Sequence, residues 1–310
     1  MNSPHPSWRE AWTAALYADE GFYRTGRPID HFRTSAHLGL FATSISELVR
    51  REGSATVVDL AAGGGEMLTA LHALLGDGVE LIGVEIADRP TNLPPSIGWL
   101  PELPDRIDGL LIANEWLDNI PCDVVEVDES GVVREVLVDP ESGEETLGSE
   151  VDSAWLREWW PIAEPGERAE IGETRDGAWA NAVARVSGTA IAIDYGHTRD
   201  DRPPYGSLRS YVSGRETEVI PDGTRDVTAH VAVDSVATAV GATIRTQREA
   251  LGKLGLDAGR PPLELATTDP TAYLNALAAA GEAGELVAKS GLGDFWWLIT
   301  DTRGHGTLTA

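Results

Sequence analysis

The sequence contains a single cysteine, Cys122, and its seven histidines form no H-x-x-x-H or H-E-x-x-H pair. An internal disulfide needs two cysteines, and a zinc site built from thiolates or paired histidines has no support, so we expect no bound metal. No apolar run approaches the roughly 18 residues of a membrane-spanning helix. The start, MNSPHPSWRE, lacks the basic-then-apolar pattern of a secretion signal. These absences predict a cytoplasmic protein without a membrane partner.

Basic residues are also scarce, because 24 lysines and arginines stand against 50 aspartates and glutamates, for a formal net charge of −26. Such a charge repels polyanions, so we expect no nucleic-acid partner. A cationic partner fits better than a polyanion, although general solubility explains the charge better than a substrate signal does. With 310 residues, 42% of them apolar, the chain can form one large α/β domain or two smaller ones.

The most informative segment is VVDLAAGGGE at 57–66, an apolar run that ends in an acid and is followed by consecutive glycines. In a parallel α/β sheet, the first strand leads into a glycine turn, where missing Cβ atoms let the backbone approach an adenosyl ligand. The predicted turn residues are Gly63, Gly64 and Gly65. A second strand, 79–85, ends in Glu85, about 20 residues later, where such folds place an acid for the ribose hydroxyls.

Two nucleotide cofactors use this kind of corner, and the glycine spacing helps to separate them. A pyrophosphate of NAD requires G-x-G-x-x-G, and here Leu68 or a neighbour stands at the third glycine position. S-adenosylmethionine carries no phosphate and needs only a tight turn and an acid at its ribose. The corner therefore favours S-adenosylmethionine, and a glycine-rich turn that binds nothing stays an alternative.

The chain alternates helical and extended segments. Helical spacing of apolar residues predicts helices over 7–18 and 36–50, and apolar runs predict strands over 55–60, 79–85 and 107–113. Strands separated by helical lengths are typical of a parallel sheet, which places a ligand at the carboxyl ends of its strands.

The second half of the chain adds further expected elements. Alternation predicts an inserted β-hairpin over 122–140, a helical stretch over 153–186 and a strand over 189–196. Residues 197–226 are rich in Arg, Asp, Pro and Gly and predict a long loop that folds over the site or lies on the surface. Aromatic and β-branched residues at 295–304 predict a closing strand.

Several motifs together identify a family resemblance. They are GFYR at 21–24, DHFRTS at 30–35, ANEWLDNIP at 113–121, IDYG at 193–196, GSLRSY at 206–211 and DVTAHVAVDSV at 226–236. With these motifs the chain resembles the MidA family of S-adenosylmethionine-dependent methyltransferases, relatives of a mitochondrial complex I assembly factor that methylates protein arginine. The resemblance implies a Rossmann-like class I methyltransferase with a mostly parallel seven-stranded sheet, amino-terminal helices and an inserted hairpin and helical substrate region.

We expect four parts along this chain. They are an amino-terminal helical cap (1–50), the cofactor-binding half of the core (51–121), an inserted hairpin with helices (122–186), and the remainder of the core with the loop 197–226 as a lid (187–310). The chain departs from the family pattern at Asp59, where Glu is usual, and at Ala61, where the family has Gly. It also departs at His31, where Asp is typical, and at Ala36, where Pro is frequent.

Methyl transfer is an in-line displacement that needs a nucleophile about 3 Å from the methyl group and little acid or base chemistry. Carboxylates can fix the plane of a charged guanidinium acceptor. We expect Glu115, then Asp118, to hold the acceptor beside Asn114, with His230 accepting a proton or orienting the acceptor. A helix cap with a solvated first turn is the alternative for Asp118, and a structural hydrogen bond is the alternative for His230.

The expected cofactor contacts come from the same strand ends and from the amino-terminal motif. Asp59 could accept a hydrogen bond from the cofactor's amino group or stabilise the glycine turn. Thr34 and Ser35 are predicted to cap a helix, and the resemblance places them against the methionine part of the cofactor. The full set is Thr34, Ser35, Asp59, Ala61, Gly63, Gly64, Gly65, Glu85 and Asn114.

Four functional classes follow. The first is a methyltransferase acting on a protein, with arginine as the acceptor implied by the resemblance. The second is a methyltransferase acting on a small molecule. The third is an assembly protein that binds the cofactor without turnover, and a nicotinamide oxidoreductase comes last. The sequence leaves open whether the protein forms a homodimer.

Overall fold

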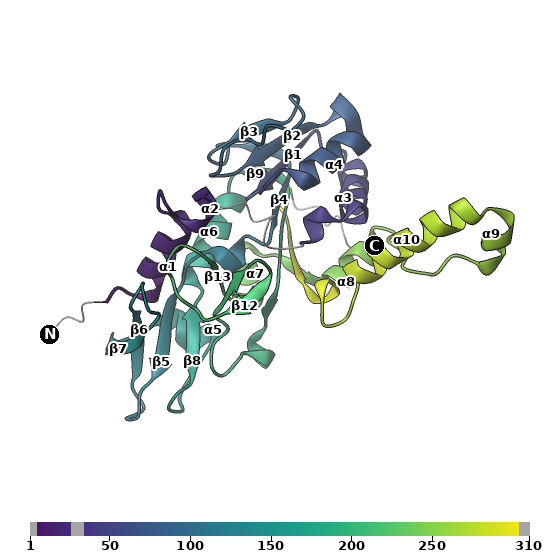
Figure 1. The fold of residues 1–310 in the computed structure, drawn as a ribbon. Helices are drawn as coiled ribbons and strands as arrows, with labels where there is room; N and C mark the ends of the chain where they lie inside the picture. The colour runs from purple at the N-terminus through teal and green to yellow at the C-terminus, as the bar shows by residue number, and fades with distance from the viewer. Residues whose placement is uncertain (1–4, 26–33, 304–310) are drawn as a thin grey trace.

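The computed structural model describes residues 5–25 and 34–303. Within these residues the centre of the fold is a seven-stranded sheet (Figure 1). Its strands, in spatial order, are β15 (Thr243–Thr246), β16 (Trp296–Asp301), β9 (Val186–Asp194), β4 (Ile107–Asn114), β1 (Thr56–Leu60), β2 (Glu80–Val84) and β3 (Gly98–Leu100). The pairs along β9, β4, β1, β2 and β3 are parallel, whereas β16 pairs antiparallel with both β9 and β15. The predicted mostly parallel α/β sheet is confirmed.

Alternate residues of each strand point to opposite faces, and helices cover both. Val57 of β1 faces a core formed with α3 (Gly39–Glu52), α4 (Glu66–Leu75) and α8 (Gln247–Lys253). Val58, the next residue, faces the core formed with α6 (Glu173–Val183) and α7 (Val233–Val240). Because helices cover both faces of the sheet, the sequence of β1 is mostly apolar and does not alternate between apolar and polar residues.

A second, antiparallel sheet is inserted between β4 and β9. Among the described residues its four strands, in spatial order, are β7 (Glu145–Glu150), β6 (Val133–Val138), β5 (Asp123–Val127) and β8 (Arg168–Ile171). Helix α1 (Trp8–Tyr17) packs its tryptophans against β5 and β6, and α5 (Ala154–Trp159) packs against β8. The predicted hairpin over 122–140 is confirmed as β5 and β6.

The prediction of a helical stretch over 153–186 is confirmed at its two ends by α5 and α6 (Glu173–Val183) and is wrong between them. Prolines and a glycine interrupt this range between α5 and β8, and β8 then pairs antiparallel with β5, so that Ala169, Glu170 and Ile171 become buried. Helical structure returns only with α6. The four residues RAEI are too few for an alternating pattern to predict a strand. The segment becomes a strand because it pairs with β5.

The range 197–226 is not one irregular loop. It contains β11 (Arg209–Val212) and β12 (Arg215–Thr217), and β11 also pairs with β13 (Asp226–Thr228). The remaining short elements are α2 (Phe22–Thr25), β10 (Gly196–His197), β14 (Val231–Ala232) and the 3-10 helices η2 (Ser35–His37), η3 (Gly76–Gly78), η4 (Leu117–Asn119), η5 (Arg199–Asp201) and η6 (Leu292–Asp294). A lid role for the β11–β12 hairpin stays a prediction, as does the division into four parts.

Two helices extend from the body of the molecule. Figure 1 shows α9 (Leu263–Thr268) and the start of α10 (Pro270–Leu286) reaching away from the main sheet. They occupy most of the segment 256–290, which matches no family motif. No helix in the described part of the chain is long and apolar enough to cross a membrane.

Candidate active site

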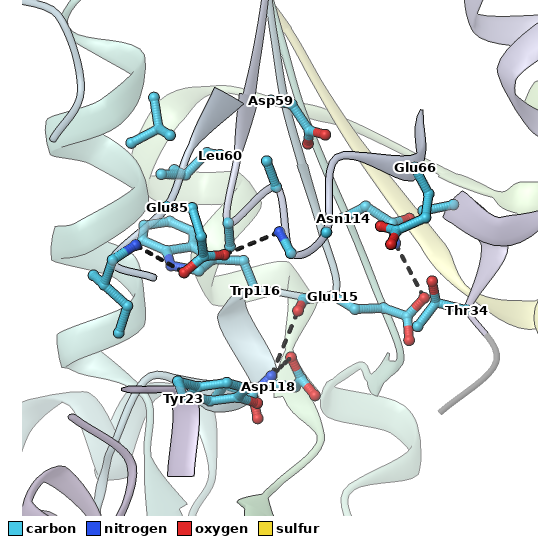
Figure 2. Close-up of a pocket in the computed structure, with 18 of the residues that line it drawn as sticks. Tyr23, Thr34, Asp59, Leu60, Glu66, Glu85, Asn114, Glu115, Trp116 and Asp118 are labelled. Carbon is cyan, nitrogen blue, oxygen red and sulfur yellow. Dashed lines mark hydrogen bonds between the residues drawn. The ribbon is translucent and has the colours of Figure 1, made fainter. Parts of the chain in front are cut away.

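A cavity of about 670 Å³ lies where β1, β2 and β4 end, and the last residues of these strands, Leu60, Val84 and Asn114, line it. Parallel strands bring their carboxyl ends to one edge of the sheet, so segments far apart in the chain meet there. Figure 2 shows Asp59 and Glu85 towards one end of the view and Asp118 and Tyr23 towards the other. The predicted residues that line the cavity are Thr34, Asp59, Ala61, Gly63, Gly64, Glu85, Asn114, Glu115 and Asp118.

The glycine turn at the end of β1 has the expected sharp geometry. Ala61, Gly63 and Gly65 have φ angles of 59°, 55° and 75°, in the left-handed region. The N–H groups of Ala61 and Ala62 both donate to the carbonyl of Val84, which ties the turn to β2. A Cβ in this region is strained, so the structure explains why a glycine suits position 61 and shows that this chain tolerates alanine there.

Glu85 closes the turn from the end of β2. Its Oε2 accepts the N–H of Gly63 at 2.9 Å, and its Oε1 accepts the N–H of Ile86 at 2.8 Å (Figure 2). Burial raises the pKa of Glu85, and these backbone donors lower it in part. The carboxylate therefore shapes the glycine turn and lines the cavity at the same time.

Asp59 is 4% exposed and lines the same end of the cavity. Burial, followed by the charges of Glu85 and Glu66, raises the pKa of Asp59 well above its usual range. Within the described residues the Asp59 carboxyl makes no hydrogen bond, so the turn is stabilised by Glu85 and not by Asp59. The Asp59 carboxyl oxygens are open to the cavity, where a ligand donor can bond to them.

Glu115 follows β4 with a φ of 54°, a strained conformation for a residue with a side chain. The N–H of Glu115 donates to the carbonyl of Ile193 at 2.8 Å, and Asn114 Nδ2 donates to Glu115 Oε1 at 3.1 Å. Burial, together with the nearby charge of Asp118, raises the pKa of Glu115 to about 8. The backbone N–H of Ser35 also bonds to this carboxyl.

Asp118 is 3% exposed, so the alternative of a helix cap with a solvated first turn is wrong. Its Oδ2 accepts hydrogen bonds from Tyr195 Oη at 2.5 Å and from Thr228 Oγ1 at 2.7 Å. The cap of the 3-10 helix η4 is instead Asp194, whose Oδ2 accepts the N–H groups of Leu117 and Asp118. The sequence shows both acids, but only the pairing of β4 with β9 brings them together.

A third acid and several tyrosines complete this end of the cavity. Tyr23 Oη donates to Asp226 Oδ1 at 2.9 Å, and burial, followed by the charge of Asp118, raises the pKa of Asp226 to about 7. The tyrosines that line the cavity are Tyr17, Tyr23, Tyr195 and Tyr211. Sequence reasoning missed Tyr17 and Tyr23 as site residues, although Tyr23 lies in the GFYR motif.

Arg175 of α6 organises the backbone behind these acids, and sequence reasoning missed it. The side chain is 1% exposed, and its Nε, Nη1 and Nη2 donate to the carbonyls of Ile120, His230 and Asp118 at 3.1, 2.9 and 2.6 Å. The guanidinium also lies 5.7 Å from the ring centroid of Trp12. One buried cation thus joins α1, η4, α6 and the β13–β14 connection.

Three predicted site residues do not line the cavity. Ser35 is buried and accepts a hydrogen bond from Gln247 Nε2 at 3.2 Å. Gly65 begins α4 at the back of the glycine turn. The His230 ring is exposed and lies edge-on to Tyr195, with centroids 5.2 Å apart. Asp30, His31 and Phe32, from the amino-terminal motif, lie outside the described residues.

The raised pKa of Glu115 predicts a pH-dependent stability. A carboxyl with a pKa of about 8 in the folded state and 4.5 in its ordinary state contributes stability that is present below pH 4.5 and lost as pH rises towards 8. Across this window we expect the unfolding free energy of wild type to fall by about 1–3 kcal/mol more than that of Glu115→Gln. Urea unfolding from pH 5 to pH 8.5 measures this, with Glu129→Gln on an exposed turn as the control. Identical pH profiles for wild type and Glu115→Gln would contradict the assignment.

Comparisons with known proteins agree with the class that the fold and cavity define, which is a class I S-adenosylmethionine-dependent methyltransferase. A family model described as "Putative S-adenosyl-L-methionine-dependent methyltransferase" matches residues 46–250. The chain belongs to this family. It is a methyltransferase, and its cofactor is S-adenosylmethionine.

Two solved structures are similar to the chain over nearly its whole length. One is a protein from Burkholderia thailandensis bound to S-adenosyl-homocysteine, with 22% identity, a TM-score of 0.76, and 99% of this chain and 90% of that chain covered. The other is a native structure of a protein of the same superfamily from Burkholderia thailandensis, with 23% identity, a TM-score of 0.77, and coverage of 98% and 89%. These likenesses show the fold. No curated protein matches the chain in sequence.

Proposed function

We propose that this enzyme transfers the methyl group of S-adenosylmethionine to a cationic nitrogen of a protein side chain, with the arginine guanidinium as acceptor. The observation that carries the proposal is the acidic and aromatic end of the cavity, where Glu115, Asp118 and Asp226 lie among four tyrosines. Carboxylates bind a guanidinium through charge-assisted hydrogen bonds, and tyrosine faces attract cations. We also propose, from the motifs that resemble the MidA family, that the enzyme is of the MidA type and that it acts in the cytoplasm.

The other end of the cavity suits the cofactor. The turn at Gly63 and Gly64 leaves room for the backbone to approach the ligand closely, and Glu85 lies where the ribose hydroxyls are expected. The unpartnered carboxyl of Asp59 offers an acceptor for an amino group. Thr34 and Asn114 line the cavity beside Glu115, where the methionine part is expected, and Asn114 Nδ2 donates to Glu115 Oε1. When bound, the cofactor supplies an electrophilic methyl group on a sulfonium.

On this proposal the chain's own residues orient the acceptor and receive its proton. Glu115 holds the guanidinium so that one nitrogen faces the methyl group, and Asp118 and Asp226 stabilise its positive charge. As the new N–C bond forms, the methyl–sulfur bond of the sulfonium would break to leave S-adenosylhomocysteine, and the accepting nitrogen releases one proton. With a pKa near 8 in the free enzyme, lowered when a cation binds beside it, Glu115 is suited to accept this proton near neutral pH.

A small-molecule acceptor is the second candidate, and one observation favours it. Tyr211 and Gly214 of the β11–β12 hairpin also line the cavity, so this hairpin reduces access from one side. A cofactor-binding assembly protein without turnover is the third candidate, suggested by the departures at Ala61 and His31. Mass spectrometry of peptides after incubation with labelled S-adenosylmethionine tests the first candidate against the other two. Label on arginine peptides but not on matched lysine peptides supports the proposal, and an enzyme that binds the cofactor but labels neither peptide contradicts it.

Cofactor binding gives a prediction that does not need the acceptor. Glu85→Ala should weaken S-adenosylhomocysteine binding by about 10- to 100-fold, because it removes a charged hydrogen-bond acceptor worth about 1.5–3 kcal/mol and loosens the glycine turn. Calorimetric titration measures the effect, and Glu80→Ala at the exposed start of β2 is the matched control. If Glu85→Ala bound S-adenosylhomocysteine as tightly as wild type does, Glu85 would not contact the ribose of the cofactor.

A further inference from the structure

The 3-10 helix η2 and the residue before it, here called the 34–37 wall, form one side of the cavity. Thr34, Ala36 and His37 line the cavity, whereas the side chain of Ser35 is fully buried. His37 Nδ1 accepts the N–H of Thr34 at 2.9 Å, which closes the turn on itself. The backbone N–H of Ser35 bonds to the Glu115 carboxyl. The 34–37 wall therefore lies directly beside the end of β4.

Gln247, the first residue of α8, holds the 34–37 wall from its buried side. The Gln247 side chain is fully buried, and its Nε2 donates to Ser35 Oγ at 3.2 Å and to the carbonyl of Leu286 at 3.2 Å. Its Oε1 accepts Trp297 Nε1 at 3.2 Å. An indole can only donate and a carbonyl can only accept, so Trp297 and Leu286 fix the direction of the amide. Ser35 thus bonds to a group that α10 and β16 hold in one orientation.

Core packing alone does not explain a buried amide at position 247. Burial of an amide costs free energy unless the amide is hydrogen-bonded, and an apolar side chain of similar volume would fill the space without that cost. A single 3-10 turn has few hydrogen bonds of its own, so its position depends on partners elsewhere. A second bond acts on the residues that follow η2, because Glu282 Oε1 of α10 accepts the N–H of Leu40 at 2.6 Å. The carboxyl-terminal helices therefore support the amino-terminal side of the cavity.

The polarity of the cavity indicates which part of the cofactor meets the 34–37 wall. Leu60 and Ile86, which lie next to Glu85, are apolar and suit the adenine ring. Thr34 and Glu66 line the cavity with polar groups, which suit the charged amino and carboxylate groups of the methionine part. Figure 2 shows Thr34 and Glu66 across the view from Leu60. The wall is therefore placed to contact the methionine part and not the base.

We propose that Gln247 is a positioning residue of the cofactor site, which acts through Ser35 to hold the 34–37 wall against the methionine part of S-adenosylmethionine. The inference rests on the proposed function in one respect, the placement of the methionine part, and does not depend on the acceptor. Gln247 does not line the cavity, and it follows Ser35 by 212 residues in the chain. Its effect on the cofactor is therefore indirect, because loss of its bond to Ser35 releases the wall.

Calorimetric titration of the full chain with two ligands tests the proposal. S-adenosylhomocysteine carries the amino-acid part, whereas methylthioadenosine keeps the adenosine and the sulfur but lacks that part. Ser35→Ala and Gln247→Met should each weaken binding of S-adenosylhomocysteine by about 5- to 30-fold and change binding of methylthioadenosine by less than about threefold. Glu85→Ala should instead weaken binding of both ligands, because both contain the ribose.

Two further variants make the test specific. The double variant Ser35→Ala with Gln247→Met should bind S-adenosylhomocysteine no more weakly than the weaker single variant, because both changes remove the same bond. The matched control is Ser235→Ala, which also removes a buried hydroxyl that bonds to a tryptophan. Ser235 Oγ accepts Trp155 Nε1 at 2.9 Å, and Ser235 does not line the cavity. This control should destabilise the fold and bind both ligands as wild type does.

Four outcomes would overturn the proposal. They are equal weakening of the two ligands, wild-type binding of S-adenosylhomocysteine by Ser35→Ala, losses that add in the double variant, and an equal loss in Ser235→Ala. If Gln247→Met fails to fold, Ser35→Ala still decides, since it removes only one hydroxyl. Failure of the enzyme to label an arginine peptide would leave these titrations unchanged, because none of them uses an acceptor.

Discussion

Replacing Arg175 by methionine should lower the free energy of unfolding by about 3–5 kcal/mol. Methionine fills part of the volume, but it leaves the carbonyls of Asp118, Ile120 and His230 without their donors. It also removes a positive charge beside two buried acids, because burial raises the pKa of both Asp118 and Asp194 and the charge of Arg175 offsets part of that rise. Urea unfolding followed by tryptophan fluorescence measures the loss.

Two further variants make the interpretation specific. Arg175→Lys keeps the charge but cannot reach three carbonyls with one planar group, so it should recover only part of the lost stability. Arg157→Met removes an arginine whose side chain is 63% exposed and whose ion pair with Asp152 lies in solvent, and it should change stability by less than about 1 kcal/mol. If Arg175→Met changed the unfolding free energy as little as Arg157→Met, the three bonds from Arg175 to backbone carbonyls would not stabilise the fold.

Glu115→Ala and Glu115→Gln should lower methyl transfer by about 100- to 1000-fold while S-adenosylhomocysteine still binds. Alanine removes the acceptor contact, and glutamine keeps its shape but loses the charge and the ability to take a proton. The measurement is the rate of label transfer to an arginine peptide at saturating cofactor.

The control for this experiment neutralises an exposed acid that also lines the cavity. Glu102→Gln should leave the rate within a few-fold of wild type, because Glu102 is solvated and lies on the segment after β3. Wild-type rates in both Glu115 variants would remove this residue from the mechanism. Loss of cofactor binding in these variants would instead assign Glu115 to the cofactor end of the cavity.

The central part of the fold could be predicted from the chain because its signals are local. The apolar run before Gly63, the glycine turn and the acid at Glu85 each reflect a requirement of one strand end, and parallel pairing then brings these ends to one edge. Glu115 and Asp118 were predicted on the same basis. The amino-terminal helix over 7–18 followed from the spacing of Trp8, Trp12 and Leu16, which are buried in the structure.

The remaining features depend on partners that are distant in the chain. Strand β8 exists because β5 pairs with it, and Asp194 caps η4 only because β9 lies beside β4. In the sequence Arg175 is one charged residue of a predicted helix, and only the fold brings three backbone carbonyls around it.

The amino-acid sequence alone thus determined the cofactor corner, since strand, turn and acid follow one another within about 30 residues, the length of one βαβ unit. Only the tertiary structure decided the acceptor end. There Tyr17, Tyr23, Asp118 and Asp226 converge from segments up to about 200 residues apart, as the bond between Tyr23 and Asp226 shows. Burial raises the pKa of all four groups, and the charges of neighbouring acids raise it further for Tyr17, Tyr23 and Asp226, which no local pattern contains.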